Sequence, residues 1–204
     1  MSSTDPRLDM DNAMWRTLNL YHQRIDAERQ GNGGPHRHMA VGPATGRLIN
    51  LLASSLDAPQ ILELGTSLGY STIWLADAAR ATGGNVITME LEAEKSALAK
   101  EMAEKAGLAD WVDYQVGDAL ELLNILDGPF DFVLIDHWKD LYLPSFEALL
   151  GKLAPGAILV ADNMIRGGRS GGQAAYAAAV RATPSMTSVL LPVGSGLEVS
   201  RYEP

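Results

Sequence analysis

The chain has 204 residues, which suits one domain with a substantial core. Its 25 acidic residues outnumber its 16 basic ones, and the formal net charge of −9 argues against a nucleic-acid partner, because a phosphate backbone calls for a basic face. The sequence contains no cysteine, so disulfides, thiolate metal sites and a cysteine nucleophile are all excluded.

The N-terminal stretch MSSTDPRLDM lacks the apolar core of a signal peptide. No apolar run approaches the ~18 residues that a membrane-spanning helix needs. We therefore expect a cytoplasmic protein that has no membrane partner and is a monomer or a homodimer.

Hydrophobic spacing predicts the secondary structure in chain order. Two helices are expected first, at 11–30 and 43–56, with a breaker-rich loop at 31–39 between them. Short apolar runs then alternate with segments of helical spacing. The strands are predicted at 60–64, 85–90, 111–116, 130–136 and 156–162, and the helices at 70–81, 92–107, 119–126, 142–153 and 172–182. The tail at 186–202 predicts two strands joined by a turn that contains Gly194 and Gly196.

Five strand–helix units with apolar strands predict an α/β fold, in which a parallel sheet carries helices on both faces and the tail adds an antiparallel hairpin. We expect one domain over 1–204, with a helical cap at 1–57 and an α/β core at 58–204. Ligands of such sheets bind at the carboxyl ends of the strands.

The first strand ends in the turn GTSLG, 65–69, which matches the G-x-S-x-G pattern of serine hydrolases. That chemistry needs an acid and then a histidine after Ser67. His137 is the only later histidine, and it is adjacent to Asp136, far from the end of the chain. A chance match in a glycine-rich turn is the better interpretation.

The same turn lacks the glycine spacing of a dinucleotide site, because Ser67 stands where the second glycine would be. A carboxylate at Glu63 suits a cationic cofactor such as S-adenosylmethionine (SAM) better than a pyrophosphate. Glu90, at the end of the second strand, is placed to accept hydrogen bonds from both ribose hydroxyls, a role that NAD and SAM sites share. The alternative is that both glutamates are solvated carboxylates at strand ends.

Two further stretches are informative: DHWKDLYLP at 136–144 and LVADNMI at 159–165. With these motifs the chain resembles the catechol O-methyltransferases, which are Mg²⁺-dependent and use SAM to methylate vicinal diphenols. The resemblance extends from about HMAVG at 38–42 to GLEVSRY at 196–202. It implies a Rossmann-like methyltransferase fold with a seven-stranded, mostly parallel sheet.

The strand ends agree with a metal site. Asp136 ends the fourth strand, and Asp162 and Asn163 end the fifth. If these strands are neighbours, their ends lie ~4.8 Å apart, and carboxylate and amide oxygens suit Mg²⁺. The alternative is that Asp162 and Asn163 only form a turn.

The resemblance also implies roles for single residues. Lys139 matches the lysine that takes the proton from the attacking hydroxyl, although a surface lysine paired with Asp140 is the alternative. The acceptor contacts implied are Lys139, Asn163, Glu198 and Trp138. The cofactor contacts implied are Val41, Glu63, Gly65, Ser67, Ser71, Glu90, Asp118, Ala119, Asp136, His137 and Trp138.

The acceptor pocket departs from the animal enzymes, because Arg37 and Gly167 replace apolar residues and RGGRSGG at 166–172 is rich in glycine and arginine. We expect tolerance of catechols with acidic or bulky tails. Two other functions remain open. One is a caffeoyl-CoA-type O-methyltransferase, and the other is a SAM-binding module without catalysis.

Overall fold

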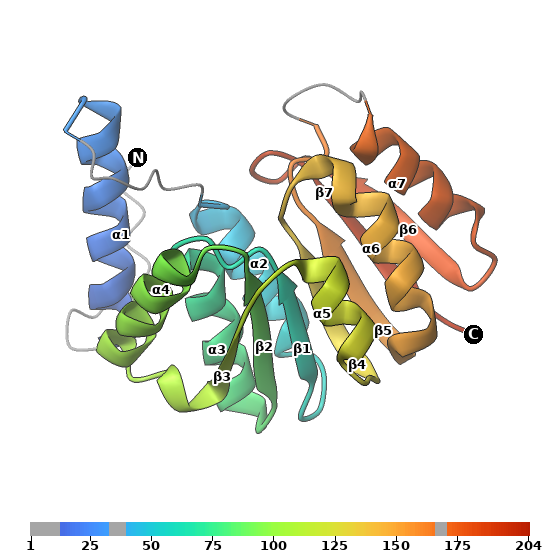
Figure 1. The fold of residues 1–204 in the computed structure, drawn as a ribbon, viewed down its shortest axis with the longest axis horizontal. Helices are drawn as coiled ribbons and strands as arrows, with labels where there is room; N and C mark the ends of the chain where they lie inside the picture. Colours follow the sequence, from blue (N-terminus) through green and yellow to red (C-terminus); the bar gives the residue numbers. More distant parts are fainter. Residues whose placement is uncertain (1–12, 33–39, 166–170) are drawn as a thin grey trace.

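The computed structural model describes residues 13–32, 40–165 and 171–204. In these ranges the chain forms one seven-stranded sheet covered by seven α-helices (Figure 1). The strands are β1 (Gln60–Leu64), β2 (Asn85–Glu90), β3 (Val112–Val116), β4 (Phe130–Ile135), β5 (Leu153–Ala161), β6 (Met186–Leu191) and β7 (Leu197–Tyr202). The helices are α1 (Ala13–Arg29), α2 (Pro43–Ala53), α3 (Tyr70–Thr82), α4 (Ala93–Ala106), α5 (Ala119–Ile125), α6 (Tyr142–Leu149) and α7 (Gly172–Ala182).

The strand order is β3-β2-β1-β4-β5-β7-β6. Strand β7 is antiparallel to both of its neighbours, β5 and β6, and the other strand pairs of this sheet are parallel. The order reverses between β1 and β4, which is where a doubly wound sheet opens a crevice for ligands. The α/β fold with a mostly parallel sheet and a C-terminal hairpin is therefore confirmed. The hairpin inserts β7 beside β5 and leaves β6 as the outer strand.

Each face of the sheet carries its own apolar cluster, because successive side chains of a strand point to opposite faces. Ile61 faces a cluster formed with α1–α4, whereas Leu62 faces a cluster formed with α5–α7. The strands β1, β2, β4 and β5 are largely buried on both faces, as their near-continuous apolar runs predict, whereas the edge strands β3 and β6 are partly exposed. Each fully buried Leu, Ile or Phe contributes about 1.5–3 kcal/mol to stability.

The main difference from the predicted elements lies before β5. The helix α6 ends at Leu149 instead of residue 153, and β5 begins at Leu153 instead of residue 156. Leu153 pairs with Phe130, and the register then shifts so that Ile158 pairs with Phe132. Pro155 and Gly156 lie in this irregular stretch. From the sequence, these two residues indicate a loop before the strand, and the strand was therefore predicted to begin at residue 156.

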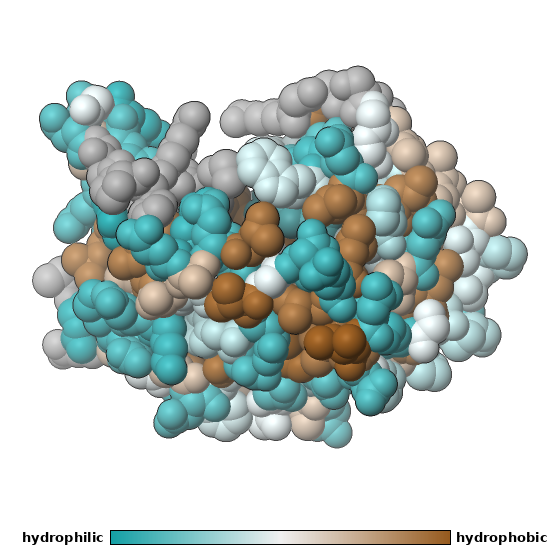
Figure 2. Space-filling view, in the orientation of Figure 1, coloured by the Kyte–Doolittle hydropathy of each residue, from teal (hydrophilic) through white to brown (hydrophobic). Residues whose placement is uncertain are grey.

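No helix in the described ranges is long and apolar enough to cross a membrane. In Figure 2 apolar side chains gather across the middle of the displayed face, over β3 and α5. Exposed large apolar residues of this region and of the neighbouring β2–α4 connection are Leu91, Val116 and Ile125.

Candidate active site

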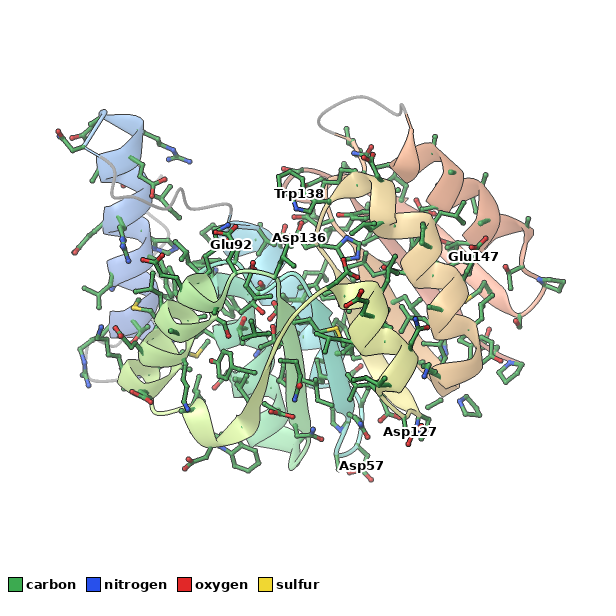
Figure 3. The ribbon with its side chains drawn as sticks, viewed as in Figure 1. Asp57, Glu92, Asp127, Asp136, Trp138 and Glu147 are labelled. Atoms are coloured by element: carbon green, nitrogen blue, oxygen red, sulfur yellow. The ribbon has the colours of Figure 1, made fainter. Side chains whose placement is uncertain are left out.

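A cavity of about 370 Å³ opens at the carboxyl ends of β1, β2, β3, β4 and β5. Figure 3 shows Asp136, Trp138 and Glu92 near this end of the sheet, whereas Asp57 and Asp127 lie at the opposite end. Most of the predicted site residues line this cavity: Gly65, Ser67, Glu90, Asp118, Ala119, Asp136, His137, Trp138, Lys139, Asp162 and Asn163. Ser71 lines a small recess that shares Gly65, Ser67 and Asp136 with the cavity.

The glycine turn after β1 is shaped by close backbone approach. A Cβ on Gly65, whose φ is +105°, would lie 2.5 Å from the carbonyl oxygen of Asp136, so only glycine fits. The N–H groups of Gly65 and Thr66 both donate to the carbonyl oxygen of Met89. Ser67 has a φ of 49°, a left-handed conformation that costs a non-glycine residue about 1–2 kcal/mol. Its N–H donates to Oε2 of Glu90 at 2.7 Å.

Two carboxylates define the part of the cavity next to β2 and β3. Glu90 accepts from the backbone N–H groups of Ser67 and Glu92, which orients its carboxylate at the end of β2. Asp118 is the N-cap of α5 and accepts from the N–H groups of Leu120 and Glu121. Both carboxylates therefore belong to the structure as well as to the cavity wall, and neither is merely solvated.

Several lining residues were not among the predicted site residues: Ala40, Met89, Leu91, Glu92, Lys95, Gly117 and Leu141. Most of them flank a predicted site residue, so proximity in sequence was an available signal. Lys95 had no such signal, because it reaches the cavity from the first turn of α4, where it pairs with Glu92.

Asp136 and Asp162 lie at the ends of two paired strands, since Ile135 pairs with Ala161 in the parallel β4–β5 ladder. Burial and the neighbouring Asp162 raise the pKa of Asp136 to about 8, although Lys139 acts in the opposite direction. Burial also raises the pKa of Asp162. Asn163 has a φ of 59°, and its N–H donates to Oδ1 of Asp162 at 2.6 Å. The arrangement combines two adjacent carboxylates with an amide side chain, and it is more than a surface turn.

Metal-ligand chemistry at this place rests on oxygen atoms. Within residues 13–32, 40–165 and 171–204 there is no group of three or more His, Cys, Asp or Glu side chains that could hold a metal ion. Two carboxylates and one amide are the donors that this end of the cavity offers. Such a set suits a hard cation that keeps waters or substrate oxygens in its remaining positions.

Lys139 follows β4, and its side chain lines the cavity. It is therefore not a surface lysine paired with Asp140, which was the alternative. Its Nζ donates to the hydroxyl of Tyr142 at 2.7 Å and to the carbonyl oxygen of His137 at 3.1 Å, and it lies 3.5 Å from Oδ1 of Asp136. The Tyr142 hydroxyl in turn donates to the carbonyl oxygen of Asp162 at 3.1 Å. Burial raises the pKa of Tyr142 well above its ordinary value, so the phenol stays neutral. Tyr142 was missed by the sequence reasoning, and it joins the lysine to the acidic pair.

His137 and Trp138 line the same cavity in different environments. His137 donates through Nδ1 to the carbonyl oxygen of Trp138, and its Nε2 lies 2.9 Å from Oγ of Ser145. Burial lowers the pKa of His137, which keeps the ring neutral. The Trp138 side chain is 69% exposed, so it is not a core residue. An exposed indole at a cavity mouth is available to cover a flat ligand.

Three predicted site residues line neither the cavity nor the adjoining recess. Val41 is buried next to the lining residue Ala40. Glu63 points from β1 toward α3, and its Oε2 accepts from the hydroxyl of Thr72 on α3 and from that of Thr88 on β2. The strand alternation decides this direction, because Glu63 shares the face of Ile61. The other oxygen of this buried carboxylate, Oε1, has no hydrogen-bond partner in the described structure, and the contact of Glu63 with a cofactor stays a prediction.

Glu198 is fully buried on the opposite face of the sheet from its neighbour Leu197. Its carboxylate accepts from Nε and Nη2 of Arg181 at 2.7–2.9 Å and from the hydroxyl of Ser188 at 2.6 Å. It lines a second cavity, of about 200 Å³, between α7 and the β6–β7 hairpin. Glu198 therefore lines a different cavity from Lys139 and Asn163, and an ion pair from α7 holds its carboxylate.

The burial of Glu63 makes a testable prediction about pH. Burial raises the pKa of this carboxyl above its ordinary value of 4.5. Between the pKa of the unfolded chain and that of the folded protein, the folded protein therefore keeps a proton that the unfolded chain has released. This stabilising contribution is present at acid pH and is lost as the pH rises toward the raised pKa. We expect Glu63→Gln to gain several °C in melting temperature relative to wild type at pH 8, and much less at pH 5, because about 1 kcal/mol corresponds to about 2–4 °C in a domain of this size.

The measurement is the melting temperature of both proteins across that pH range. Glu147→Gln, at an exposed position on α6, is the matched control and should show no pH-dependent gain. An equal melting temperature difference at pH 5 and pH 8 would contradict the assigned environment of Glu63.

The expectations for Arg37, Gly167, and the arginines at 166 and 169 concern residues outside the described ranges. They stay predictions from the sequence.

Comparisons with known proteins agree with this geometry. A family model described as O-methyltransferase matches residues 23–201. A catechol O-methyltransferase of Niastella koreensis is 40% identical over 135 residues, 64% of this chain and 61% of that protein. A caffeoyl-CoA O-methyltransferase of Eucalyptus globulus is 30% identical over 139 residues, 66% of this chain and 56% of that protein. The match thus spans less than two thirds of the length of either relative.

A solved structure extends the similarity to the whole chain. The O-methyltransferase of Bacillus cereus, in complex with SAH, is 28% identical with a TM-score of 0.77, and the match covers 99% of this chain and 98% of that one. The two proteins therefore share the fold described above. Because the family model covers most of the sequence, the chain belongs to the O-methyltransferase family.

Proposed function

We propose that this O-methyltransferase transfers a methyl group from SAM to one hydroxyl of a catechol, with Mg²⁺ bound beside the acceptor. The observation that carries the proposal is one cavity whose wall contains Glu90 and Asp118 on one side and Asp136, Asp162, Asn163 and Lys139 on the other. The first pair suits the hydroxyls and base of a nucleoside. The second group suits a cation and an acidic diol.

Features of the cavity fit SAM. The Ser67 hydroxyl is buried against the cavity and has no hydrogen-bond partner in the described structure, as expected of a group that contacts a ligand. Gly65 and Ser71 line the recess that we assign to the amino-acid end of the cofactor. Trp138 is exposed at the mouth and can cover the adenine. The similarity to a methyltransferase bound to SAH supports the same assignment.

The donor set also fits Mg²⁺. Asp162 is buried and Asp136 is largely buried beside it, and burial together with the charge of Asp162 raises the pKa of Asp136 to about 8. A buried carboxylate pair of this kind is costly unless a cation balances it, and one lysine is the cation that the described structure places there. When bound, Mg²⁺ supplies Lewis-acid stabilisation of the deprotonated acceptor.

The chain's own residues perform the remaining tasks. Lys139 Nζ is held by hydrogen bonds to the carbonyl oxygen of His137 and to the hydroxyl of Tyr142. We assign it the role of the general base that takes the proton from the attacking hydroxyl of the acceptor. Trp138 limits water access from the mouth. Exclusion of water favours this reaction, because the charges of the acceptor oxyanion and the sulfonium cancel in the transition state.

One relative supports a second candidate acceptor. The Eucalyptus globulus protein is named for caffeoyl-CoA, a catechol carried by a large thioester, and it is 30% identical in the matched region. Both acceptors require the same metal and lysine chemistry, so only the size of the acceptor distinguishes them. A non-catalytic SAM-binding module is a weaker candidate, because it has no use for the Lys139–Tyr142–Asp162 chain of hydrogen bonds.

A product screen by mass spectrometry tests the proposal. The protein is incubated with SAM and with a neutral catechol, a catechol carboxylate, caffeoyl-CoA, resorcinol or a monophenol, each with Mg²⁺ or with excess chelator. We expect a single added methyl group on vicinal diphenols, and only with Mg²⁺. Methylation of resorcinol at the catechol rate would refute the diol requirement, and SAM binding without any product would favour the non-catalytic module.

A further inference from the structure

The turn at 65–69 accepts a hydrogen bond from a residue that does not line the cavity. Helix α1 packs against α4 and α3, and Tyr21 of α1 is 1% exposed. Its hydroxyl donates to the carbonyl oxygen of Leu68 at 2.5 Å, within the turn that follows β1. Its ring meets the ring of Tyr70 edge-to-face with centroids 5.5 Å apart. Next to it, His22 Nε2 lies 3.0 Å from the Tyr70 hydroxyl.

The segment that α1 contacts is part of the ligand site. Leu68, Tyr70 and Ser71 line the recess beside the cavity, together with Gly65 and Ser67. The N–H of Gly69 donates to the carbonyl oxygen of Thr66 and closes the turn just before α3 begins. A change in the position of this turn therefore moves the recess and the first residues of α3 together.

The turn needs external support, because its conformation is strained at Ser67. From the sheet side, Met89 and Glu90 accept hydrogen bonds from Gly65, Thr66 and Ser67. From the opposite side, in the described structure, the Tyr21 hydroxyl donates a hydrogen bond to the carbonyl oxygen of Leu68. The fit is close, since a Cβ on Gly69 would lie 3.1 Å from that hydroxyl and 2.8 Å from Cβ of Ala99.

Packing alone does not account for Tyr21. A phenylalanine would fill the same space between α1, α3 and α4, and a buried hydroxyl costs stability unless it has a hydrogen-bond partner. The partner here is a backbone carbonyl at a cavity-lining turn. The tyrosine therefore carries a directional contact in addition to its apolar surface.

We propose that Tyr21, assisted by His22, is a positioning residue that holds the 65–70 turn in the conformation that binds the amino-acid end of SAM. Helix α1 thereby acts on cofactor affinity without contacting the cofactor. The inference rests on the proposed use of SAM, but not on the acceptor or on the metal.

Calorimetric titration with SAH tests this role, because SAH binding needs neither acceptor nor turnover. We expect Tyr21→Phe to weaken SAH affinity about 3- to 10-fold, which is the net effect of one neutral hydrogen bond. The KM for SAM should rise by a similar factor, while kcat at saturating SAM and the KM for the acceptor stay within about twofold of wild type. A residue that only stabilised the fold would lower the melting temperature without this division between KM and kcat.

Tyr114→Phe is the matched control. Tyr114 packs against the same apolar cluster, and its hydroxyl donates to the carbonyl oxygen of Ala99, outside the turn. We expect a loss of stability but unchanged SAH affinity. His22→Ala, at a half-buried position, removes the contact with Tyr70 without opening the core and should weaken SAH affinity about 2- to 3-fold even if Tyr21→Phe folds poorly.

The outcomes separate the two levels of the proposal. If wild type and both α1 variants bind SAH equally, or if Tyr114→Phe weakens SAH binding as much as Tyr21→Phe, the positioning role is overturned while the proposed function stands. If wild type itself does not bind SAH, the proposed cofactor fails, and this inference fails with it.

Discussion

Replacing Lys139 with methionine is expected to lower kcat for a catechol by about 10²- to 10⁴-fold, the usual contribution of a general base, while SAH affinity stays within about twofold of wild type. Nζ faces the acidic end of the cavity and is held by Tyr142 and by the carbonyl oxygen of His137. Methionine keeps the length of the side chain but cannot take a proton. The measurement is kcat under saturating SAM and Mg²⁺, with SAH titration alongside it.

Lys152→Met is the matched control, because Lys152 is also half-buried and also donates to a backbone carbonyl, that of Leu126. It lies directly before β5, at the amino end of that strand, away from the cavity. We expect its kcat to equal that of wild type. If Lys139→Met retains a tenth or more of wild-type kcat, Lys139 is not the base, and the Lys139–Tyr142 contact is structural.

Removal of divalent ions with a chelator is expected to abolish methylation of catechols, and added Mg²⁺ should restore it. Asp162→Asn should lower kcat/KM by about 10²-fold or more even in excess Mg²⁺, because metal assistance contributes several kcal/mol to the barrier and about 1.4 kcal/mol corresponds to a factor of ten. Asparagine can still accept the N–H of Asn163, so the local turn is preserved. SAH affinity should change little in either experiment.

Asp127→Asn serves as the control for this substitution, since Asp127 is exposed at the end of the sheet opposite the cavity (Figure 3). Its kinetics and Mg²⁺ dependence should match wild type. Undiminished turnover in chelator would refute the metal assignment. In that case Asp136 and Asp162 would be a buried acid pair balanced by Lys139.

Local sequence patterns predicted the elements well, because strand and helix periodicity depends on residues close together in the chain. They also predicted which residues end the strands, and in a parallel sheet such residues meet at one edge. Gly65, Glu90, Asp118, Asp136 and Asp162 reached the cavity for this reason. The start of β5 was misplaced, because an irregular pairing with Phe130 overrides the local breaker signal at Pro155 and Gly156.

The direction of individual side chains was less predictable. Glu63 and Glu198 carry the residue type expected of ligand contacts, yet strand alternation turns one toward Thr72 of α3 and the other toward Arg181. The partner of Glu198 lies 17 residues away along the chain. No local pattern reports such a contact, because it depends on how α7 packs on the hairpin.

The sequence by itself therefore determined the α/β class, the O-methyltransferase resemblance and the residues at the strand ends, since all of these depend on short-range periodicity and on contiguous motifs. The tertiary structure decided that β1 and β4 are neighbours, that Tyr142 holds Lys139 and that Tyr21 reaches Leu68 across 47 residues. Such contacts join segments whose separation along the chain carries no periodic signal, and only the packing of helices on the two faces of the sheet brings them within bonding distance.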